Sequence, residues 1–442
     1  MRKRQISILS VGLSLLFALS GCSSAKTGSS SSTSSATNSG PVTLTIMSSE
    51  QTSQEGPDEK AMATKYMKEH PNVTINFVGV ANNSINQKII AENSSNDLPD
   101  AFYMNSEFMA QADSIGIVAD CKKIVGNGFL TSLSNGVVDA ASINGHMVMV
   151  PWQMIPMALI YRSDWLKEAG LTSLETWDDF LKAAQAFTKD TNGDGKIDRW
   201  GFSMVGSRDS SGENRFMAIA ATFGVDAAVK DKSGKWTSAL TGKQFIQALT
   251  YFTDLANKYG VVPAGATQTN YSQAANYFAQ EKTGLMISGS NAIGAILSSN
   301  PNLKGKLASV ALPKETRHST VLQVAGYAIT NSCKNKAVLA DYLKSMTTDD
   351  NAIPFAQTWG RLPVTKSAST NEAFKDQPYS GFIDAAKYAY KLSAFPQYTQ
   401  LIDIAGEAYT NTIGNKMSVT DAMKTVSQKT KTLIDDTNAG ED

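Results

Sequence analysis

The sequence contains few of the residues on which most catalytic and metal sites depend. Its 442 residues include only 3 histidines and 3 cysteines. No Gly-x-Ser-x-Gly, His-Glu-x-x-His or Walker motif is present. The acidic pairs Asp178-Asp179, Asp349-Asp350 and Asp435-Asp436 are adjacent in sequence, so on a helix their carboxylates point apart and favour solvated faces over catalysis. These absences argue against an enzyme, with a secreted glycosidase as the alternative.

An excess of charge of one sign is also missing. The chain has 40 basic and 40 acidic residues. Removing the first 21 residues takes away Arg2, Lys3 and Arg4 and no acidic residue, which leaves 37 basic against 40 acidic, a net charge of −3. Nucleic-acid binding depends on a basic surface, so this composition excludes nucleic acid as a partner. Beyond residue 21, no apolar run approaches the length that crosses a bilayer.

The N-terminus has the order of a secretory signal. Three basic residues precede an apolar run from Ile6 to Leu19 that is too short to span a membrane, so residues 1–21 are predicted to be a signal peptide. The junction Leu19-Ser20-Gly21-Cys22 resembles a bacterial lipobox, which implies cleavage before Cys22 and acyl chains such as palmitate on that residue. Such chains anchor a protein to the extracytoplasmic face of the cell membrane. An ordinary signal peptide followed by an incidental cysteine is the alternative.

Residues 22–40 are predicted to be a flexible tether. From Ser23 to Gly40 the chain is almost entirely Ser, Thr, Ala, Gly and Asn, with Lys26 the only charge. Such a segment buries too little apolar surface to offset its conformational entropy. The two remaining cysteines, Cys121 and Cys333, either form one disulfide or stay unpaired in the interior, and the second interpretation is favoured.

From about Pro41 onward, strands and helices alternate. Residues 42–47, 73–78 and 101–104 have the pattern of strands, and residues 57–69 that of a helix. This order predicts an α/β architecture with mostly parallel sheets, in which ligands bind beyond the carboxyl ends of the strands. The residues that follow the first and third strands are Ser49, Glu50, Gln51, Asn105 and Ser106.

The centre of the chain has the clearest helix signals. Thr176 is a good N-cap for a helix whose apolar face includes Trp177 and Phe180, and Asp179 occupies the third position of a capping box. A helix over 163–169 is expected to end at Gly170. Further amphipathic helices are predicted over 242–259, 336–346 and 418–436, and no internal repeat is visible.

Several blocks resemble signatures of the family 1 extracellular solute-binding proteins, the maltose-binding-protein-like components of ABC sugar importers. The blocks follow one another in the family's order over nearly the whole mature chain. The central ones are 144–152, 158–171 and 176–181, and the others are 69–73, 98–102, 282–290, 326–329 and 360–364. Two departures are Cys121, where the family usually has Leu, and Ala325, where a Gly-Gly pair is common.

The resemblance implies a two-lobed periplasmic-binding-protein-like fold with three interdomain crossings, near 154–160, 321–328 and 359–366. Lobe one is then 41–153 plus 328–360, and lobe two 160–321 plus 366–442. The implied function is an extracellular receptor, expected to be a monomer and not an enzyme. It closes on a sugar or oligosaccharide in the cleft between the lobes and delivers it to the membrane permease of an ABC importer.

A sugar has hydroxyl edges and apolar faces, so its cleft needs flat aromatic rings and planar polar groups. Trp152 and Trp359 are the two tryptophans in loops beside predicted crossings, and each either stacks on the sugar or packs at the hinge. Arg361 either binds vicinal hydroxyls or pairs with an acid across the hinge. The remaining ligand candidates, which have helix capping as their alternative, are Glu50, Gln51, Asn105, Ser106, Ser288, Ser290 and Asn291.

The loop 190–198 matches the first part of a calcium-binding loop. Asp190, Asn192, Asp194 and Asp198 place oxygens at positions 1, 3, 5 and 9, with glycine at position 6. Position 12 is Gly201 where a bidentate glutamate is needed, so a plain Asx-rich turn is the alternative. No cofactor is required by this interpretation, and calcium would have a structural role.

Overall fold

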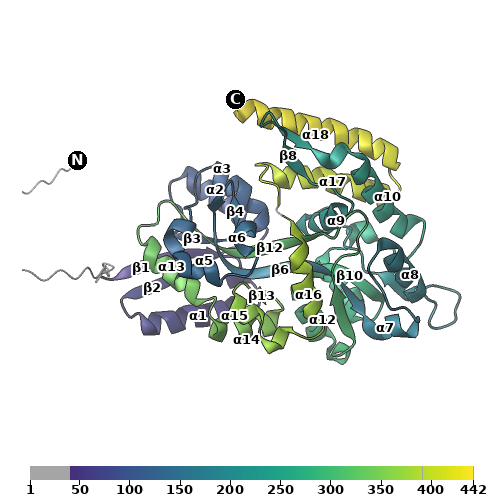
Figure 1. Cartoon of the computed structure of the whole chain (residues 1–442), viewed down its shortest axis with the longest axis horizontal. Coiled ribbons are helices and arrows are strands. Elements are labelled where there is room, and N and C mark those ends of the chain that lie inside the picture. The colour runs from purple at the N-terminus through teal and green to yellow at the C-terminus, as the bar shows by residue number, and fades with distance from the viewer. Residues whose placement is uncertain (1–39, 391, 442) are drawn as a thin grey trace, which may run out of the picture. The chain divides into compact units, whose positions relative to one another are not determined.

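The computed structural model describes residues 40–390 and 392–441 (Figure 1). The predicted signal peptide, Cys22 and all but Gly40 of the predicted tether lie outside these residues. Within the described part of the chain, no helix has both the length and the apolar character that crossing a membrane requires.

The described strands form one large network and two small hairpins. They are β1 Val42–Ser48, β2 Val73–Gly79, β3 Ala101–Asn105, β4 Ser142–Ile143, β5 His146–Met147, β6 Val150–Arg162, β7 Trp200–Phe202, β8 Ala228–Lys230, β9 Trp236–Ser238, β10 Thr283–Gly289, β11 Leu307–Val310, β12 Thr320–Ile329, β13 Leu362–Pro363 and β14 Ala389–Tyr390. The main network has the order β2-β1-β3-β12-β6-β10-β7, with β11 and β13 also on β6, and β14 on β12.

Helices cover both the part of this network that contains β1, β2 and β3 and the part that contains β10 (Figure 1). They are α1 Gly56–Glu69, α2 Ile85–Ser94, α3 Met109–Ser114, α4 Lys122–Val125, α5 Asn127–Ser132, α6 Val137–Ala140, α7 Ser163–Glu168, α8 Trp177–Phe187, α9 Ser210–Thr222, α10 Lys243–Asn257, α11 Tyr271–Ala279, α12 Asn291–Ser299, α13 Lys336–Ser345, α14 Asp349–Trp359, α15 Lys366–Ser369, α16 Ser380–Ala385, α17 Tyr398–Ile413 and α18 Val419–Glu441.

The elements predicted from local sequence are confirmed to within a few residues. The three strands became β1, β2 and β3, and the helices became α1, α7, α8, α10, α13 and α18. The capping box is present, since the Thr176 hydroxyl accepts from the Asp179 amide and the Asp179 carboxylate accepts from the Thr176 amide. Gly170 follows α7 with a φ of 69°, the left-handed conformation that glycine adopts without strain.

The prediction of mostly parallel sheets is wrong for the central strands. β1 pairs in parallel with β2 and β3, as expected, but β12 is antiparallel to β3 and β6, and β6 is antiparallel to β10, β11 and β13. The reason is that β6 and β12 are long strands that pass from one side of the network to the other, instead of returning through a helix. In Figure 1 they lie between β3 on one side and β10 on the other.

The three segments predicted as crossings lie side by side. The first part of β6 pairs with β12 as far as Pro156, and from Met157 onward it pairs with β10. β13, from the third segment, pairs with Met154 and Gln153 of β6. The bounds of the two lobes stay a prediction.

Two hydrophobic cores meet along β6. Ala158 and Ile160 belong to the core that contains β1 and β3, whereas Met157 and Leu159 belong to the core formed with α8, α10 and α17. This alternation follows from the period of two along a strand. The first core is not confined to the predicted lobe one, because it also includes Phe278 of α11, a residue of the predicted lobe two.

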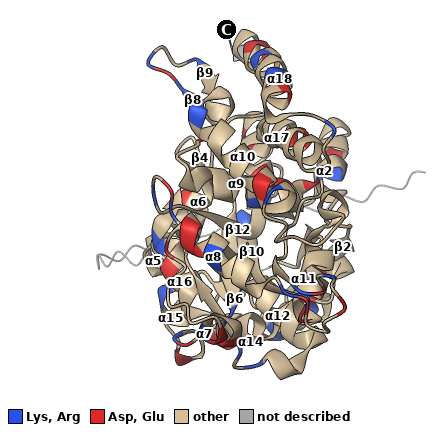
Figure 2. Cartoon of the chain, turned by 90° about the vertical axis from the view of Figure 1, so that its right-hand side faces the viewer, with Lys and Arg blue, Asp and Glu red and all other residues tan. Residues whose placement is uncertain are grey.

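The two cysteines are unpaired, as the favoured interpretation predicted. Cys121 and Cys333 are both buried free thiols. On the side drawn in Figure 2, basic and acidic residues are interspersed. Along α18 several are paired one turn apart, for example Lys424 with Asp421 and Lys431 with Asp435.

Candidate functional site

A polar cavity of about 400 Å³ lies where the carboxyl ends of β1 and β3 meet the crossing segments. Because β1 is parallel to both β2 and β3, the segments that follow these strands converge at one edge of the sheet. The crossings contribute Ile155 and Arg361. The remaining lining residues are Ser49, Glu50, Thr52, Ser53, Ala81, Asn82, Tyr103 and Asn105.

Arg361 is the centre of the polar network around this cavity. Its Nη1 donates to Glu50 Oε2 at 3.1 Å, Gln153 Oε1 at 2.8 Å and the Tyr103 hydroxyl at 3.2 Å. Its Nη2 donates to Glu55 Oε1 at 2.9 Å. One guanidinium therefore connects the third crossing with β3, β6 and the turn before α1. Arg361 pairs with two acids, as one of the two sequence interpretations held, and its binding of sugar hydroxyls stays a prediction.

Two glutamates face one arginine in this buried network. Burial raises the pKa of Glu50, and the positive charge of Arg361 opposes that effect. Burial disfavours the charged form of Arg361, but Tyr103, Glu50 and Glu55 together raise the pKa of its guanidinium above the ordinary value. The arginine remains charged, and the site is acidic overall when both glutamates are ionised.

Several buried polar atoms in and beside the network lack a hydrogen-bond partner. Within the described ranges they include Ser49 Oγ and Arg361 Nε, which belong to residues lining the cavity, and Gln153 Nε2. Gln51 Oε1 and Ser290 Oγ also have no hydrogen-bond partner among the described residues. Native proteins seldom leave buried polar groups unpaired, so these atoms are suited to bind water or a polar ligand.

The turn that holds Glu50 is fixed by close packing. It is the 3₁₀ helix η1, Glu50–Thr52, which leads directly into α1. A side chain at Gly56 would place its Cβ 2.9 Å from the carbonyl oxygen of Glu50, so only glycine lets the turn lie against the helix. Glu55, the N-cap of α1, is thereby brought next to Arg361.

Three of the sequence-predicted ligand residues, Glu50, Asn105 and Arg361, line the cavity together. Gln51 follows Glu50, but its Nε2 donates to Glu59 behind the turn. Ser106 is buried, and its hydroxyl donates to the Val324 carbonyl and accepts from the Val324 amide. Ser106 therefore joins the segment after β3 to β12, which is a structural role, and its role as a ligand residue stays a prediction.

Trp152 lies in the interior and not on a ligand surface. Its side chain is 3% exposed and packs against Phe355 and Tyr327, with ring centroids 4.7 Å and 6.1 Å apart. The pairing of β6 with β12 shifts register here, with Gln153 opposite Ala325 and Pro151 opposite Gly326, so Trp152 is the extra residue of a bulge. The structure thus shows Trp152 packed in the interior beside the predicted first crossing.

Gly326 explains how this bulge is accommodated. A Cβ at this position would lie 2.1 Å from the Val150 carbonyl oxygen, so the backbones of β12 and β6 approach closely here. Gly326 is the second residue of the position pair where the family commonly has two glycines and this chain has Ala325 and Gly326. The close approach is present although the chain departs from the family pattern at Ala325.

Trp359 ends α14 at the edge of the site. It is partly buried against the first core, and its Nε1 donates to Asp58 Oδ2 at 2.7 Å. It does not line the 400 Å³ cavity. Its stacking on a sugar stays a prediction.

The lobe-two candidates lie on β10 and at the start of α12. Ser288 is buried and its hydroxyl accepts from Arg215 Nη2 at 2.8 Å, while Asn291 Nδ2 donates to the Tyr271 hydroxyl at 3.2 Å. Ser290 contacts the third crossing, because a Cβ on Gly360 would lie 2.6 Å from the Ser290 carbonyl oxygen. Gly360 has a φ of 70° and caps α14, so two constraints require glycine there.

Sequence reasoning missed Tyr103, Gln153 and Glu55. Gln153 had a visible signal, since it is the single polar residue in the apolar stretch 147–160. Tyr103 lies within a buried strand, and nothing in its neighbourhood distinguished it from a core aromatic. Glu55 gave no signal beyond its position before a helix.

In the loop 190–198 the oxygens proposed to bind calcium accept hydrogen bonds from the loop itself. Asp190 accepts from the Gly193 and Gly195 amides, Asp194 from the Lys196 amide, and Asp198 from the Thr191 amide and hydroxyl. Asn192 accepts from the Asp194 amide. Across the described part of the chain, no group of three or more acidic, histidine or cysteine side chains is arranged to hold a metal. Calcium binding stays a prediction.

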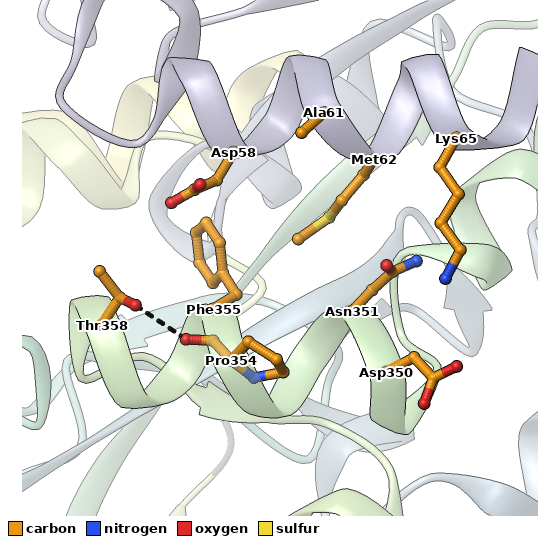
Figure 3. Close-up of a pocket in the computed structure, with 9 residues that line it drawn as sticks. All are labelled: Asp58, Ala61, Met62, Lys65, Asp350, Asn351, Pro354, Phe355 and Thr358. Carbon is orange, nitrogen blue, oxygen red and sulfur yellow. Dashed lines mark hydrogen bonds between the residues drawn. The ribbon is translucent and has the colours of Figure 1, made fainter.

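Two further hollows lie close to the site. One, of about 240 Å³, lies between α1 and α14, and Met62, Phe355 and Asp58 are among the residues that line it (Figure 3). Asp58 is the residue that accepts from the Trp359 indole. The other, of about 630 Å³, is lined by Met154 and by residues of α15 and α16. Since Met154 and Ile155 point to opposite faces of β6, this second hollow lies behind the crossing strand, away from the polar cavity.

Residues 50–353 match the family described as bacterial extracellular solute-binding protein. The chain is 26% identical over 245 residues to Lipoprotein LipO of Bacillus subtilis, a match that covers 54% of this chain and 47% of LipO, so the chain spans about half of that relative's length. It also resembles two solved structures, each covering 89% of this chain. One is a solute-binding protein of Thermotoga lettingae bound with alpha-D-tagatose (TM-score 0.76, 19% identity, 99% of that chain), and the other is maltose-bound MalE3 of T. maritima (TM-score 0.74, 20% identity, 100% of that chain). These likenesses confirm the predicted two-lobed α/β fold.

Proposed function

The chain belongs to the family of bacterial extracellular solute-binding proteins, and from this membership we propose that it is a receptor that captures a carbohydrate and delivers it to an ABC importer. The observation that carries the proposal is the polar cavity around Arg361. It presents carboxylates as acceptors, a guanidinium as donor, and buried polar atoms without partners. Sugar hydroxyls both donate and accept, so they suit this mixed set of groups.

The ligand chemistry is supported by the structural neighbours. One of them is bound with tagatose and another with maltose, both of which are polyhydroxylated and uncharged. The cavity of about 400 Å³ is within the size range of small-molecule sites, and a site this polar differs from the mainly apolar pockets that bind drug-like molecules. A monosaccharide or a short oligosaccharide is the proposed solute.

Capture is proposed to occur by closure of the lobes about the three crossings. One wall of the site comes from η1 and β3, and the opposing wall is proposed to include Ser290 and Asn291 at the start of α12. A ligand that contacts both walls stabilises the closed form, because only that form makes both sets of contacts. The membrane permease then receives loaded protein in preference to empty protein.

The proposal places the receptor on the extracytoplasmic face of the cell membrane, held by acyl chains on Cys22 and acting as a monomer. The name of the relative LipO supports a lipoprotein. Cys22→Ser should move the protein from the membrane fraction to the medium or periplasm. Deleting residues 24–40 should leave the ligand affinity of the soluble domain unchanged, because all the proposed ligand residues lie beyond residue 40.

The test is a thermal-shift screen of the soluble domain against maltose, maltotriose, tagatose and a fructooligosaccharide, followed by calorimetric titration of each sugar that raises the melting temperature. A ligand that binds only the folded protein raises that temperature by mass action. Arg361→Gln should abolish the shift. A glycosidase is the alternative function, and release of shorter sugars from maltotriose during incubation would contradict a receptor.

A further inference from the structure

Glu59 is a buried acid directly behind the turn that carries Glu50. It lies in α1 and is 0% exposed, although glutamate is seldom fully buried without a charged partner. Its carboxylate accepts hydrogen bonds from three other elements. Ser48 Oγ, at the end of β1, donates from 3.0 Å, and Gln51 Nε2 of η1 and the Tyr327 hydroxyl of β12 donate as well.

These donors lie on both sides of the ligand-facing residues. Ser48 precedes Ser49 and Glu50, and Gln51 follows them, so one carboxylate holds both ends of the segment that lines the cavity. The Ser48 hydroxyl also accepts from the Glu50 amide at 3.2 Å. The position of the Glu50 side chain relative to Arg361 therefore depends on contacts that lead back to Glu59.

The third donor links the same carboxylate to the hinge. Tyr327 is in the crossing strand β12, and its ring packs edge-on against Tyr103, with centroids 5.6 Å apart. The Tyr103 hydroxyl in turn accepts from Arg361. Glu59 thus contacts the binding turn directly and reaches the arginine through two buried tyrosines.

We propose that Glu59 is the positioning residue of this binding site: it holds the Ser49–Gln51 segment and Tyr327 in the arrangement that binds ligand, and its loss of a proton strengthens ligand binding. The inference rests on the proposed receptor function and adds to it a dependence of affinity on pH. An ionised carboxylate accepts from all three donors, whereas a protonated one carries a hydrogen that one donor must turn away from.

The surroundings place this proton exchange near neutral pH. Burial raises the pKa of Glu59 to about 7, with the Gln51 and Ser48 hydrogen bonds opposing the rise. The other titratable or charged groups that face it are Glu50 from η1, the Tyr327 hydroxyl from β12, the Tyr342 hydroxyl from α13 and Lys60 on α1. Of these, Glu50 also titrates, so the test must separate the two acids.

Glu59→Gln is the variant that tests the proposal, and Glu213→Gln is its matched control. Burial also raises the pKa of Glu213 to about 7, with Asp403 and Asp209 adding to the effect, but Glu213 is in α9 and contacts none of the cavity residues named above. Both variants leave Glu50 free to titrate. A difference between them therefore reports on Glu59 alone.

The first measurement needs no ligand. It is hydrogen exchange of the Thr52 and Ser53 amides, which bond to Ser49 and Glu50 within the turn, at about pH 6 and pH 8.5 and corrected for intrinsic rates. Protection should increase with pH in the unmodified protein and in Glu213→Gln, and should stay low at both pH values in Glu59→Gln. Equal behaviour of the two variants would overturn the proposal.

The second measurement is calorimetric titration with maltotriose at the same two pH values. Affinity should rise about fivefold with pH in the unmodified protein and in Glu213→Gln, the factor that one net hydrogen bond provides. Glu59→Gln should remain near the low-pH value. If maltotriose and the other sugars of the panel fail to bind while the exchange result is obtained, the carbohydrate proposal fails and the positioning role stands.

If Glu59→Gln does not fold, Tyr327→Phe replaces it. This change removes the hydroxyl that donates to Glu59 and that also lies 3.0 Å from Ser48 Oγ, so it breaks two contacts of the same network. It should reduce the protection of the turn amides mainly at the higher pH. Unchanged protection in Tyr327→Phe at both pH values would overturn the proposal.

Discussion

Among single side chains, Arg361 makes the most consequential contacts of the site. It is 16% exposed and bonds to Glu50 and Glu55, which are 5% and 13% exposed. Arg361→Ala leaves both acids without their cation, and breaking a buried pair costs about 3 kcal/mol. We expect a loss of that size in the free energy of unfolding at about pH 8, measured by urea denaturation, and a smaller loss at about pH 5.5, because burial raises the pKa of Glu50 and lets it take up a proton more readily.

Arg208→Ala is the control for this prediction. Arg208 bonds to Asp403 and Glu407, but its side chain is 41% exposed and that of Asp403 47%. Exposed pairs contribute about 1 kcal/mol or less, so this variant should lose little stability. An equal loss of unfolding free energy in both variants would show that burial does not increase the contribution of the Arg361 network to stability.

Trp359 is the remaining aromatic candidate, since Trp152 is in the core. If its ring covers one face of a bound sugar, Trp359→Ala removes an anchor worth about 2 kcal/mol, and we expect affinity to fall about 30-fold. Asp58→Asn, which removes the carboxylate that accepts from the indole but keeps the ring, should lower affinity much less. Calorimetry with the best sugar of the panel measures both. A lower melting temperature with unchanged affinity would show that Trp359 packs at the hinge and does not contact the sugar.

Among helices and loops, the segment 190–198 gives the clearest choice between two chemistries. Its carboxylates and its asparagine accept from the backbone of the same turn, which is the pattern of the plain Asx-rich turn given as the alternative to calcium. If these hydrogen bonds alone hold the loop, a chelator leaves the melting temperature unchanged. A fall under chelator that Asp194→Ala abolishes would instead establish calcium binding, because a ligand held only by the folded state stabilises it.

How well an element could be predicted from the sequence depends on how far apart along the chain its interacting residues lie. The helix α8 depends on Thr176 and Asp179, three positions apart, and on a repeating apolar face, so its start was predictable. The bulge at Trp152 depends on the approach of Gly326 to Val150 from a distant strand, and a one-residue shift turns a side chain to the other face. That is why the sequence left two interpretations open for Trp152 and its neighbour Gln153 was missed.

The site itself was predictable only in part, for the same reason. Glu50 and Asn105 follow strands, and the rule for parallel sheets locates such residues. The partners of Arg361 are 208 to 311 positions away along the chain. The sequence could therefore not identify them, and only the folded arrangement shows that two of them are acids. Ser106 and Ser288 had the right residue type and position, but their hydroxyls are taken up by Val324 and Arg215.

For the protein as a whole, buried acids determine how stability depends on pH. Burial raises the pKa of Glu50 and Glu107, and raises that of Glu59 and of Glu213 to about 7, from an ordinary value of 4.5. Between these values the folded protein binds protons that the unfolded chain releases, so protonation stabilises the fold and raising the pH withdraws that stabilisation. Other acids act in the opposite direction but at lower pH: Arg208 holds the pKa of Asp403 below its ordinary value of 3.8, so that contribution is lost only under acid conditions.

The two effects together predict that the soluble domain is most stable at mildly acidic pH. We expect the melting temperature, measured by calorimetry across a pH series, to be highest near about pH 5 and to fall steadily toward about pH 8. Glu59→Gln and Glu213→Gln each remove one group that must give up a proton in the interior, so each should flatten the alkaline side of the curve. A melting temperature that rises from pH 5 to pH 8 would show that these acids are ionised at little cost, which would require water or a cation to reach them in solution.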